Sequence, residues 1–337
     1  MSGKIYRYWL MVPSGLEEVA LDELRERVPQ IQGVNVEPGG RTGQIFFTFK
    51  RSPQQLAGLQ AAMQLAGVVA QMHRVTVGQP GLDHLCDRIA KVDFAAVANL
   101  ARSGGHDVQV DRFALSATLQ GRYRFGQADV IRAVARVLRE KHGVRQGQGD
   151  NILRLHLQLN GRRGLLGIRL GPAIAPSAAL AFCLFRLLGM QAGTHLLWSR
   201  RDWREIAALE RHSTPRVLIG IGERKPARRE QQRTLAAVAK AGYYPLKSGC
   251  MDYALRHVGK DSHGEIAELA RILRFGGVGL VQVSQAAPFL AAMDEGGYPF
   301  VVLAHLRMRE RGRPYELLVL ERLEEYDPDL IQVEWES

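Results

Sequence analysis

The sequence predicts a protein of mixed α/β and α+β class, with three domains in series over 337 residues. Three observations support this prediction. Single cores seldom grow past roughly 250 residues, and a hydrophobic share of 46% can fill more than one core. The first 77 residues follow the order strand, helix, strand, strand, helix, strand. The last third alternates apolar, strand-like runs with helical patterns, which is typical of a mostly parallel sheet covered on both faces.

The first domain is expected over residues 1–77. Its predicted elements are a strand at 6–12, a helix opening after Ser14, a hairpin of 34–36 and 44–49, a second helix opening at Ser52-Pro53 and a strand at 68–77. Ser14 suits a helix N-cap because its hydroxyl can accept a hydrogen bond from a first-turn N–H group. The order βαββαβ is that of the ferredoxin-like split βαβ arrangement.

The second domain is expected over residues 78–172. Gly78-Gln79-Pro80-Gly81 is a linker-like break before a helical pattern that continues, interrupted, over 82–100. A strand-like run from Arg112, a helix opening at 127–129 and two strands at 152–160 and 164–170 follow. Helix, strand, helix and strands together indicate a second small α/β unit.

The third domain is expected over residues 173–337 and begins with a helix at 177–188. Its predicted strands are 196–197, 217–221, 278–283, 301–306 and 317–320, and its predicted helices are 202–210, 227–241, 264–274 and 286–293. Alternating strands and helices indicate a Rossmann-like sheet.

Positive charge is concentrated between Arg112 and Leu170. This stretch holds twelve Lys and Arg residues against three Asp and Glu residues, a surplus of nine, while the whole chain has a net charge of +11. Such a concentration repels itself unless a polyanion is the partner, because binding of phosphates releases counterions. The stretch is therefore predicted to be a nucleic-acid surface.

Within this stretch, particular residues are candidates for RNA contact. Arg132, Arg136 and Arg139 have the spacing i, i+4, i+7 and so share one helix face; the other candidates are Arg122, Arg124, Arg162 and Arg163, with Tyr123 and Phe125 as rings for base stacking. A solvated helix face, ordinary exposed charge in a turn at 162–163, and rings that only pack in the core are the alternative interpretations.

Other classes of site find no support in the sequence. Cys86, Cys183 and Cys250 lie far apart, and none of the ten histidines stands at a metal-ligand spacing from Cys or an acid. No run reaches the roughly 20 apolar residues that span a bilayer, and the first residues lack the apolar core of a signal peptide. We therefore expect a cytoplasmic protein with no metal and no membrane partner; the sequence does not indicate an oligomeric state.

Several segments resemble a known family. Residues 12–20 with Asp22-Glu23-Leu24 resemble the PxGLE opening of the THUMP-containing RNA methyltransferases, and residues 41–47 resemble the hairpin that follows it. Residues 120–130 are similar to the basic segment at the heart of the family's THUMP domain. The best match, over residues 5–172, is the branch that methylates N2 of guanine in tRNA acceptor stems. The resemblance implies a ferredoxin-like domain (1–77), a THUMP domain that grips tRNA (78–172) and an S-adenosylmethionine-dependent Rossmann-fold domain (173–337).

The third domain departs from this family pattern. Residues 196–205 stand where the family has a glycine-rich cofactor loop, yet they contain no glycine, and no Asn-Pro-Pro motif occurs. Glycine lets a cofactor approach the backbone closely, and we expect Trp198 and Trp203 to fill that volume instead. Glu223 is a weak candidate for the cofactor ribose, with a helix-dipole role as the alternative. The segment 252–265 looks too short for the strand and loop that would position the target amine.

Two functions follow as hypotheses. The first is a tRNA-binding or structured-RNA-binding THUMP protein whose degenerate third domain has no catalytic residues and needs no cofactor. An active modification enzyme is its candidate protein partner. The second is an active tRNA guanine-N2 methyltransferase that uses S-adenosylmethionine through displaced motifs. A non-catalytic subunit of an active methyltransferase is a further alternative.

Overall fold

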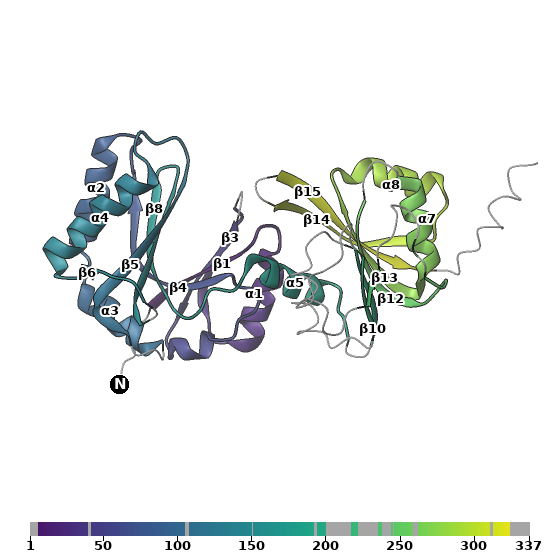
Figure 1. Cartoon of the computed structure of the whole chain (residues 1–337), viewed down its shortest axis with the longest axis horizontal. Helices are drawn as coiled ribbons and strands as arrows, with labels where there is room; N and C mark the ends of the chain where they lie inside the picture. The colour runs from purple at the N-terminus through teal and green to yellow at the C-terminus, as the bar shows by residue number, and fades with distance from the viewer. Residues whose placement is uncertain are drawn as a thin grey trace, which may run out of the picture. The chain divides into compact units, whose positions relative to one another are not determined.

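The computed structural model describes residues 6–39, 42–104, 108–149, 151–191, 194–199, 217–221, 235–237, 244, 246–258, 262–310 and 313–323. The chain divides into two compact units. One comprises Met1–Val12, Leu21–Glu37 and Gln44–Ile174, and the other comprises Pro13–Ala20, Pro38–Gly43 and Ala175–Ser337. Each unit is built around one β-sheet (Figure 1).

The first sheet has eight strands in the order β2-β3-β1-β4-β8-β7-β5-β6. The strands are β1 (Tyr6–Pro13), β2 (Gln32–Glu37), β3 (Thr42–Phe49), β4 (Gln64–His73), β5 (Gln109–Gln120), β6 (Arg145–Gln146), β7 (Ile152–Asn160) and β8 (Arg163–Arg169). Antiparallel pairing of β4 with β8 joins the strands of the two predicted N-terminal domains into one sheet. The boundaries expected near residues 77 and 172 stay predictions.

The helices of this part of the chain are α1 (Glu17–Arg27), the short 3-10 helix η1 (Pro53–Leu56), α2 (Gln79–Ala90), α3 (Phe94–Ser103) and α4 (Gln127–His142). Helix α2 packs against α4, and α4 packs against β5. Asp93 caps α3 by accepting a hydrogen bond from the Ala96 N–H at 3.1 Å. The sequence predicted the helices around 82–100 and the helix opening at 127–129, and the structure confirms both.

The prediction of a second helix from Ser52-Pro53 is wrong, because only the short helix η1 forms there. Ser52 caps η1, and the chain then continues as a loop whose backbone is held by Glu23 of α1. The buried Glu23 carboxylate accepts hydrogen bonds from the Gln60 N–H at 2.9 Å and the Ala61 N–H at 2.8 Å, and Arg27 pairs with it at 3.2 Å. Amide groups that a helix would have satisfied internally are satisfied here by one side chain.

Glu23→Ala should therefore destabilise the first unit strongly. The substitution leaves the Gln60 and Ala61 N–H groups without an acceptor, and each unsatisfied buried donor costs roughly 1–3 kcal/mol. We expect the free energy of unfolding, measured by urea denaturation, to fall by about 2–4 kcal/mol. Asp22→Ala, which removes an exposed carboxylate from the same helix, should cost less than about 1 kcal/mol; equal effects of the two substitutions would contradict the role of Glu23.

The second sheet has seven strands in the order β11-β10-β9-β12-β13-β15-β14. These are β9 (His195–Ser199), β10 (Val217–Ile221), β11 (Leu235–Ala237), β12 (Met251–His257), β13 (Leu273–Val283), β14 (Phe300–Glu310) and β15 (Arg313–Arg322), with helices α5 (Pro176–Leu187), α7 (Ser262–Ile272) and α8 (Ala286–Glu295). The strands from β11 to β13 run parallel, and β15 is antiparallel to both of its neighbours. The chain order reverses between β9 and β12, which makes their carboxyl ends the topological switch point.

The structure corrects two expectations for this unit. The helix expected over 227–241 contains β11 instead, and the segment thought too short for a strand forms β12, followed by α7. The strand was missed because Arg256, which is buried, interrupts the apolar run of β12. The helix expected at 202–210 lies outside the described residues. Among the helices that the structure describes, none is long and apolar enough to cross a bilayer.

Candidate nucleic-acid interface

Helix α4 separates an apolar face from a basic face. Its buried residues are Val130, Val134 and Leu138. Because an α-helix has about 3.6 residues per turn, the exposed arginines lie on the opposite side; they are Arg132, Arg136 and Arg139. We call these three residues the α4 arginine face. Burial of the apolar stripe thus fixes which way the guanidinium groups point.

One carboxylate lies beside the α4 arginine face. Asp129 accepts a hydrogen bond from the Gly126 N–H at 2.8 Å and pairs with the Arg132 guanidinium at 2.5 Å. The Gly126 hydrogen bond and then the Arg132 charge lower the pKa of Asp129. Within the described part of the chain, no carboxylate lies within ion-pair distance of Arg136 or Arg139. Two of the three charges are therefore available to a polyanion.

A second group of basic side chains gathers where β4 and β5 end. The Arg124 N–H donates to the Val77 carbonyl at 2.7 Å, and the Val75 N–H donates to the Arg162 carbonyl at 3.0 Å. These bonds tie the loops after β4 and β5 to the turn between β7 and β8. The exposed basic residues on these loops, which we call the basic sheet end, are His73, Arg74, Arg122, Arg124, Arg162 and Arg163.

The predicted residues of the basic sheet end differ in their surroundings. Arg122, Arg124 and Arg162 are exposed, whereas Arg163 approaches Glu37 at 3.5 Å in an exposed ion pair. Such pairs contribute little to stability and can be exchanged for a phosphate. Arg74 and His73 were missed by the sequence reasoning, since they stand outside the basic stretch and only the pairing of β4 with β8 brings them to it.

The two rings predicted to stack on bases, Tyr123 and Phe125, differ in exposure. Phe125 is only 8% exposed and stacks on Tyr123, with ring centroids 5.2 Å apart. Its ring is already covered, which favours the alternative that it packs in the core, and base stacking by Phe125 stays a prediction. Tyr123 is partly exposed and donates its hydroxyl to the Gly161 carbonyl at 2.6 Å. Burial raises the pKa of Tyr123.

In the second unit, side chains link the strands at the switch point. Arg256, at the end of β12, is 2% exposed, pairs with Glu265 of α7 and lies over the Tyr244 ring at 4.4 Å. The Tyr244 hydroxyl donates to Ser199 Oγ, at the end of β9, at 3.1 Å. Burial lowers the pKa of Arg256. We call Ser199, Tyr244, Arg256 and Glu265 the switch-point cluster.

The structure describes only part of the predicted cofactor region. Trp198 is a fully buried residue of β9. Trp203 and Glu223 lie outside the described residues, so the filling of a cofactor volume by both tryptophans and the ribose contact of Glu223 stay predictions. The described residues contain no group of three His, Cys, Asp or Glu side chains that could hold a metal ion.

Comparisons of the fold identify structural relatives over nearly the whole chain. TrmN from Thermus thermophilus matches with a TM-score of 0.65 at 17% identity, over 94% of this chain and 100% of that one. SMU.472 complexed with SAH matches with a TM-score of 0.62 at 10% identity, and a possible methylase from Clostridium difficile 630 with 0.60 at 11%; each comparison covers 96% of this chain and 100% of the other. The chain therefore has the fold of methyltransferase-type proteins. No family model and no curated protein sequence matches it.

Asp129 should stabilise the start of α4 in a pH-dependent way. Its pKa is lower in the folded than in the unfolded protein, so its contribution is present above the unfolded value of about 3.9 and is lost as the pH falls through the folded value. We expect Asp129→Asn to lower the melting temperature at pH 7, and this difference to shrink as the pH falls below the unfolded value. A difference that persists at low pH would contradict this interpretation.

Proposed function

We propose that this protein binds structured RNA, and tRNA in particular, through the α4 arginine face and the basic sheet end, and that its methyltransferase-type domain does not catalyse methyl transfer. The observation that carries the proposal is the outward placement of Arg132, Arg136 and Arg139 on α4, which begins directly after the loop that carries Arg122 and Arg124. Phosphate contacts supply most of the sequence-independent affinity for nucleic acids. The resemblance of residues 5–172 to THUMP proteins supports RNA, and tRNA among RNAs, as the partner.

The switch-point cluster supports the second half of the proposal. Ligands of open α/β sheets bind outside the carboxyl ends of the strands, at the switch point. Here the Arg256 guanidinium lies over the Tyr244 ring and pairs with Glu265 of α7, and the Tyr244 hydroxyl donates to Ser199 at the end of β9. This arrangement supports the absence of catalysis, because a guanidinium paired within its own chain occupies the end of β12. The glycine-free sequence of residues 196–205 agrees with this conclusion.

Removal of the α4 arginine face should weaken tRNA binding in a salt-dependent manner. For Arg132→Ala, Arg136→Ala and Arg139→Ala combined, we expect the slope of log K against log salt to become shallower by about 2–3. Filter binding of a tRNA transcript across a salt series measures this slope. The matched control combines Arg25→Ala, Lys50→Ala and Arg51→Ala, which removes three exposed charges elsewhere on the protein. Equal slopes for the two variants would contradict an RNA role for α4.

Titration with S-adenosylmethionine separates the proposal from the alternative, an active tRNA guanine-N2 methyltransferase. We expect no heat of binding at micromolar concentrations of the cofactor, because residues 196–205 contain no glycine that would let a cofactor approach the backbone closely. Binding in this range, together with methyl transfer to tRNA, would establish the enzyme and remove the non-catalytic assignment. The RNA-binding half of the proposal would be unaffected by that result.

A further inference from the structure

The four strands β5, β7, β8 and β4 form a sheet region whose two faces differ in chemistry. Successive side chains of a strand point to opposite faces, so residues that stand directly opposite one another form rows on one face. One face lies against α3, where Gly67 is in close contact with Leu100. Its rows contain only apolar residues and glycine: Leu115, Leu155, Ile168 and Gly67; Ala117, Leu157, Leu166 and Ala70; and Leu119, Leu159, Gly164 and Met72.

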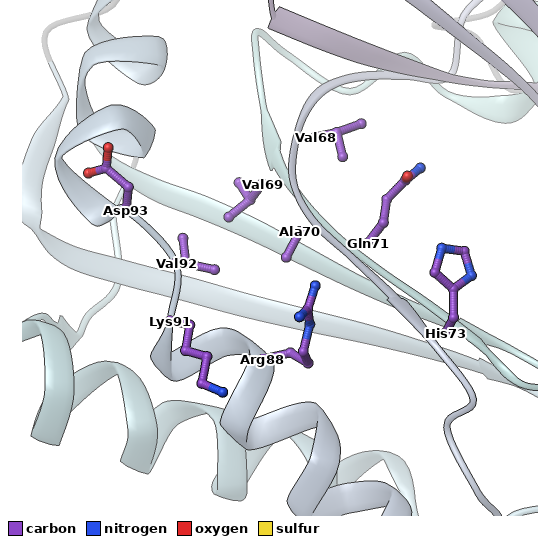
Figure 2. Close-up of a pocket in the computed structure, with 9 residues that line it drawn as sticks. All are labelled: Val68, Val69, Ala70, Gln71, His73, Arg88, Lys91, Val92 and Asp93. Atoms are coloured by element: carbon purple, nitrogen blue, oxygen red, sulfur yellow. The ribbon is translucent and has the colours of Figure 1, made fainter.

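The opposite face of the same strands is mostly polar. Figure 2 shows Val68, Gln71 and His73 on the side of β4 that points away from Arg88 of α2. Parallel strands are normally covered on both faces, yet the parallel pair β5 and β7 exposes side chains here. The rows of this face are Ser116, His156, Gly167 and Val68; Thr118, Gln158, Leu165 and Gln71; and Gln120, Asn160, Arg163 and His73.

The last of these rows lies directly before the loops of the basic sheet end. We call Gln120, Asn160, Arg163 and His73 the end row; Arg163 and His73 belong to both sets. Gln120 is partly exposed and the other three side chains are exposed. The row crosses three strand spacings of roughly 4.8 Å, so it is about 14 Å wide. This width corresponds to about four nucleotides at the roughly 3.4 Å spacing of one nucleic-acid strand.

A buried acceptor lies in the row beside the end row. Gln158 is 4% exposed, and its Oε1 atom has no hydrogen-bond donor among the described residues. By contrast, Gln71 of the same row accepts a hydrogen bond from Arg7 at 2.9 Å. Buried polar atoms are almost always hydrogen-bonded, and an exception requires an explanation. A donor group supplied by a bound partner is such an explanation for Gln158.

The charge around the end row suits a polyanion. Exposed arginines stand on the adjoining loops; they are Arg74, Arg122, Arg124 and Arg162. Among the described ion pairs, only that of Glu37 with Arg163, at 3.5 Å, brings an acid to the row. This pair is exposed and so contributes little. RNA, with a phosphate beside every base, matches neutral amides bordered by guanidinium groups.

We propose that the end row reads the bases of an unpaired RNA segment whose phosphates lie on the basic sheet end. The inference rests on the proposed RNA-binding function and adds a base preference to it. The segment is unpaired because the base edges of an RNA duplex lie in a deep, narrow groove that side chains cannot read. Asn and Gln side chains bond bidentately to adenine, so Gln120 and Asn160 favour adenine.

Binding of fluorescent hexaadenylate and hexauridylate by the full chain tests the inference. We expect tighter binding of hexaadenylate. Gln120→Ala with Asn160→Ala should weaken it at least about fivefold, the low end of what one bidentate pair contributes to discrimination, and should lower the ratio of the two affinities. The slope of log K against log salt should stay the same, because this variant removes no charge.

A matched control removes two amides elsewhere in the first unit. Gln54→Ala with Gln55→Ala, which changes exposed residues of η1, should alter neither the affinity ratio nor the salt slope. The ratio is independent of the fraction of folded protein, since both oligonucleotides bind the same folded molecules. A variant that is merely less stable therefore keeps the ratio of the unmodified chain.

The outcomes distinguish this inference from the proposed function. Equal binding of the two oligonucleotides by the unmodified chain, or an unchanged ratio in the Gln120→Ala, Asn160→Ala variant, would overturn base reading by the end row. The proposed function stands in that case if tRNA binding still depends on the α4 arginine face. If neither tRNA nor an oligonucleotide binds, both fall.

Discussion

The antiparallel pairing of β4 with β8 is the constraint on which the first unit depends. It joins strands from residues 6–73 to strands from residues 109–169 in one sheet and places His73 opposite Arg163. Without this pairing the loop after β4 would have no fixed relation to the β7–β8 turn. The basic sheet end exists because this register is set, and the bulge at Val69 shows that the pairing accommodates one residue more than a regular ladder needs.

In the first unit, the direction of the basic side chains of α4 is set by burial of its apolar residues rather than by ion pairs. Because the apolar stripe of α4 packs inward, the arginines on its other side face solvent. Asp129 offsets one of them, but its carboxylate also closes the first turn of α4 at Gly126 and so serves the helix. Repulsion among the remaining exposed guanidinium groups is a cost to the folded protein. An RNA partner would relieve that cost, which is a physical reason for charge to be retained at this density.

The sequence predicted the elements with strong periodicity and missed those determined by tertiary contacts. The helix face of Arg132, Arg136 and Arg139 could be read from spacing alone, and the structure confirms that face. The loop after η1 could not be predicted, because the acceptor for its amides is Glu23, far away in sequence. The burial of Phe125 could not be predicted either, because it depends on stacking against Tyr123. His73 gave no signal, since only the pairing of β4 with β8 places it opposite Arg163.

The contacts of the switch-point cluster describe the strand ends of the second unit more directly than the absence of a glycine-rich motif does. Taking a guanidinium out of water costs several kcal/mol unless geometry and charge compensate it. For Arg256, Glu265 supplies the opposite charge and the Tyr244 ring supplies a cation–π contact, whereas its Nε and Nη1 atoms are buried without a hydrogen-bond partner among the described residues. Either partner alone would leave the charge poorly compensated, so the cluster functions as one unit. The cluster thus joins the ends of β9 and β12 to α7 through side chains alone.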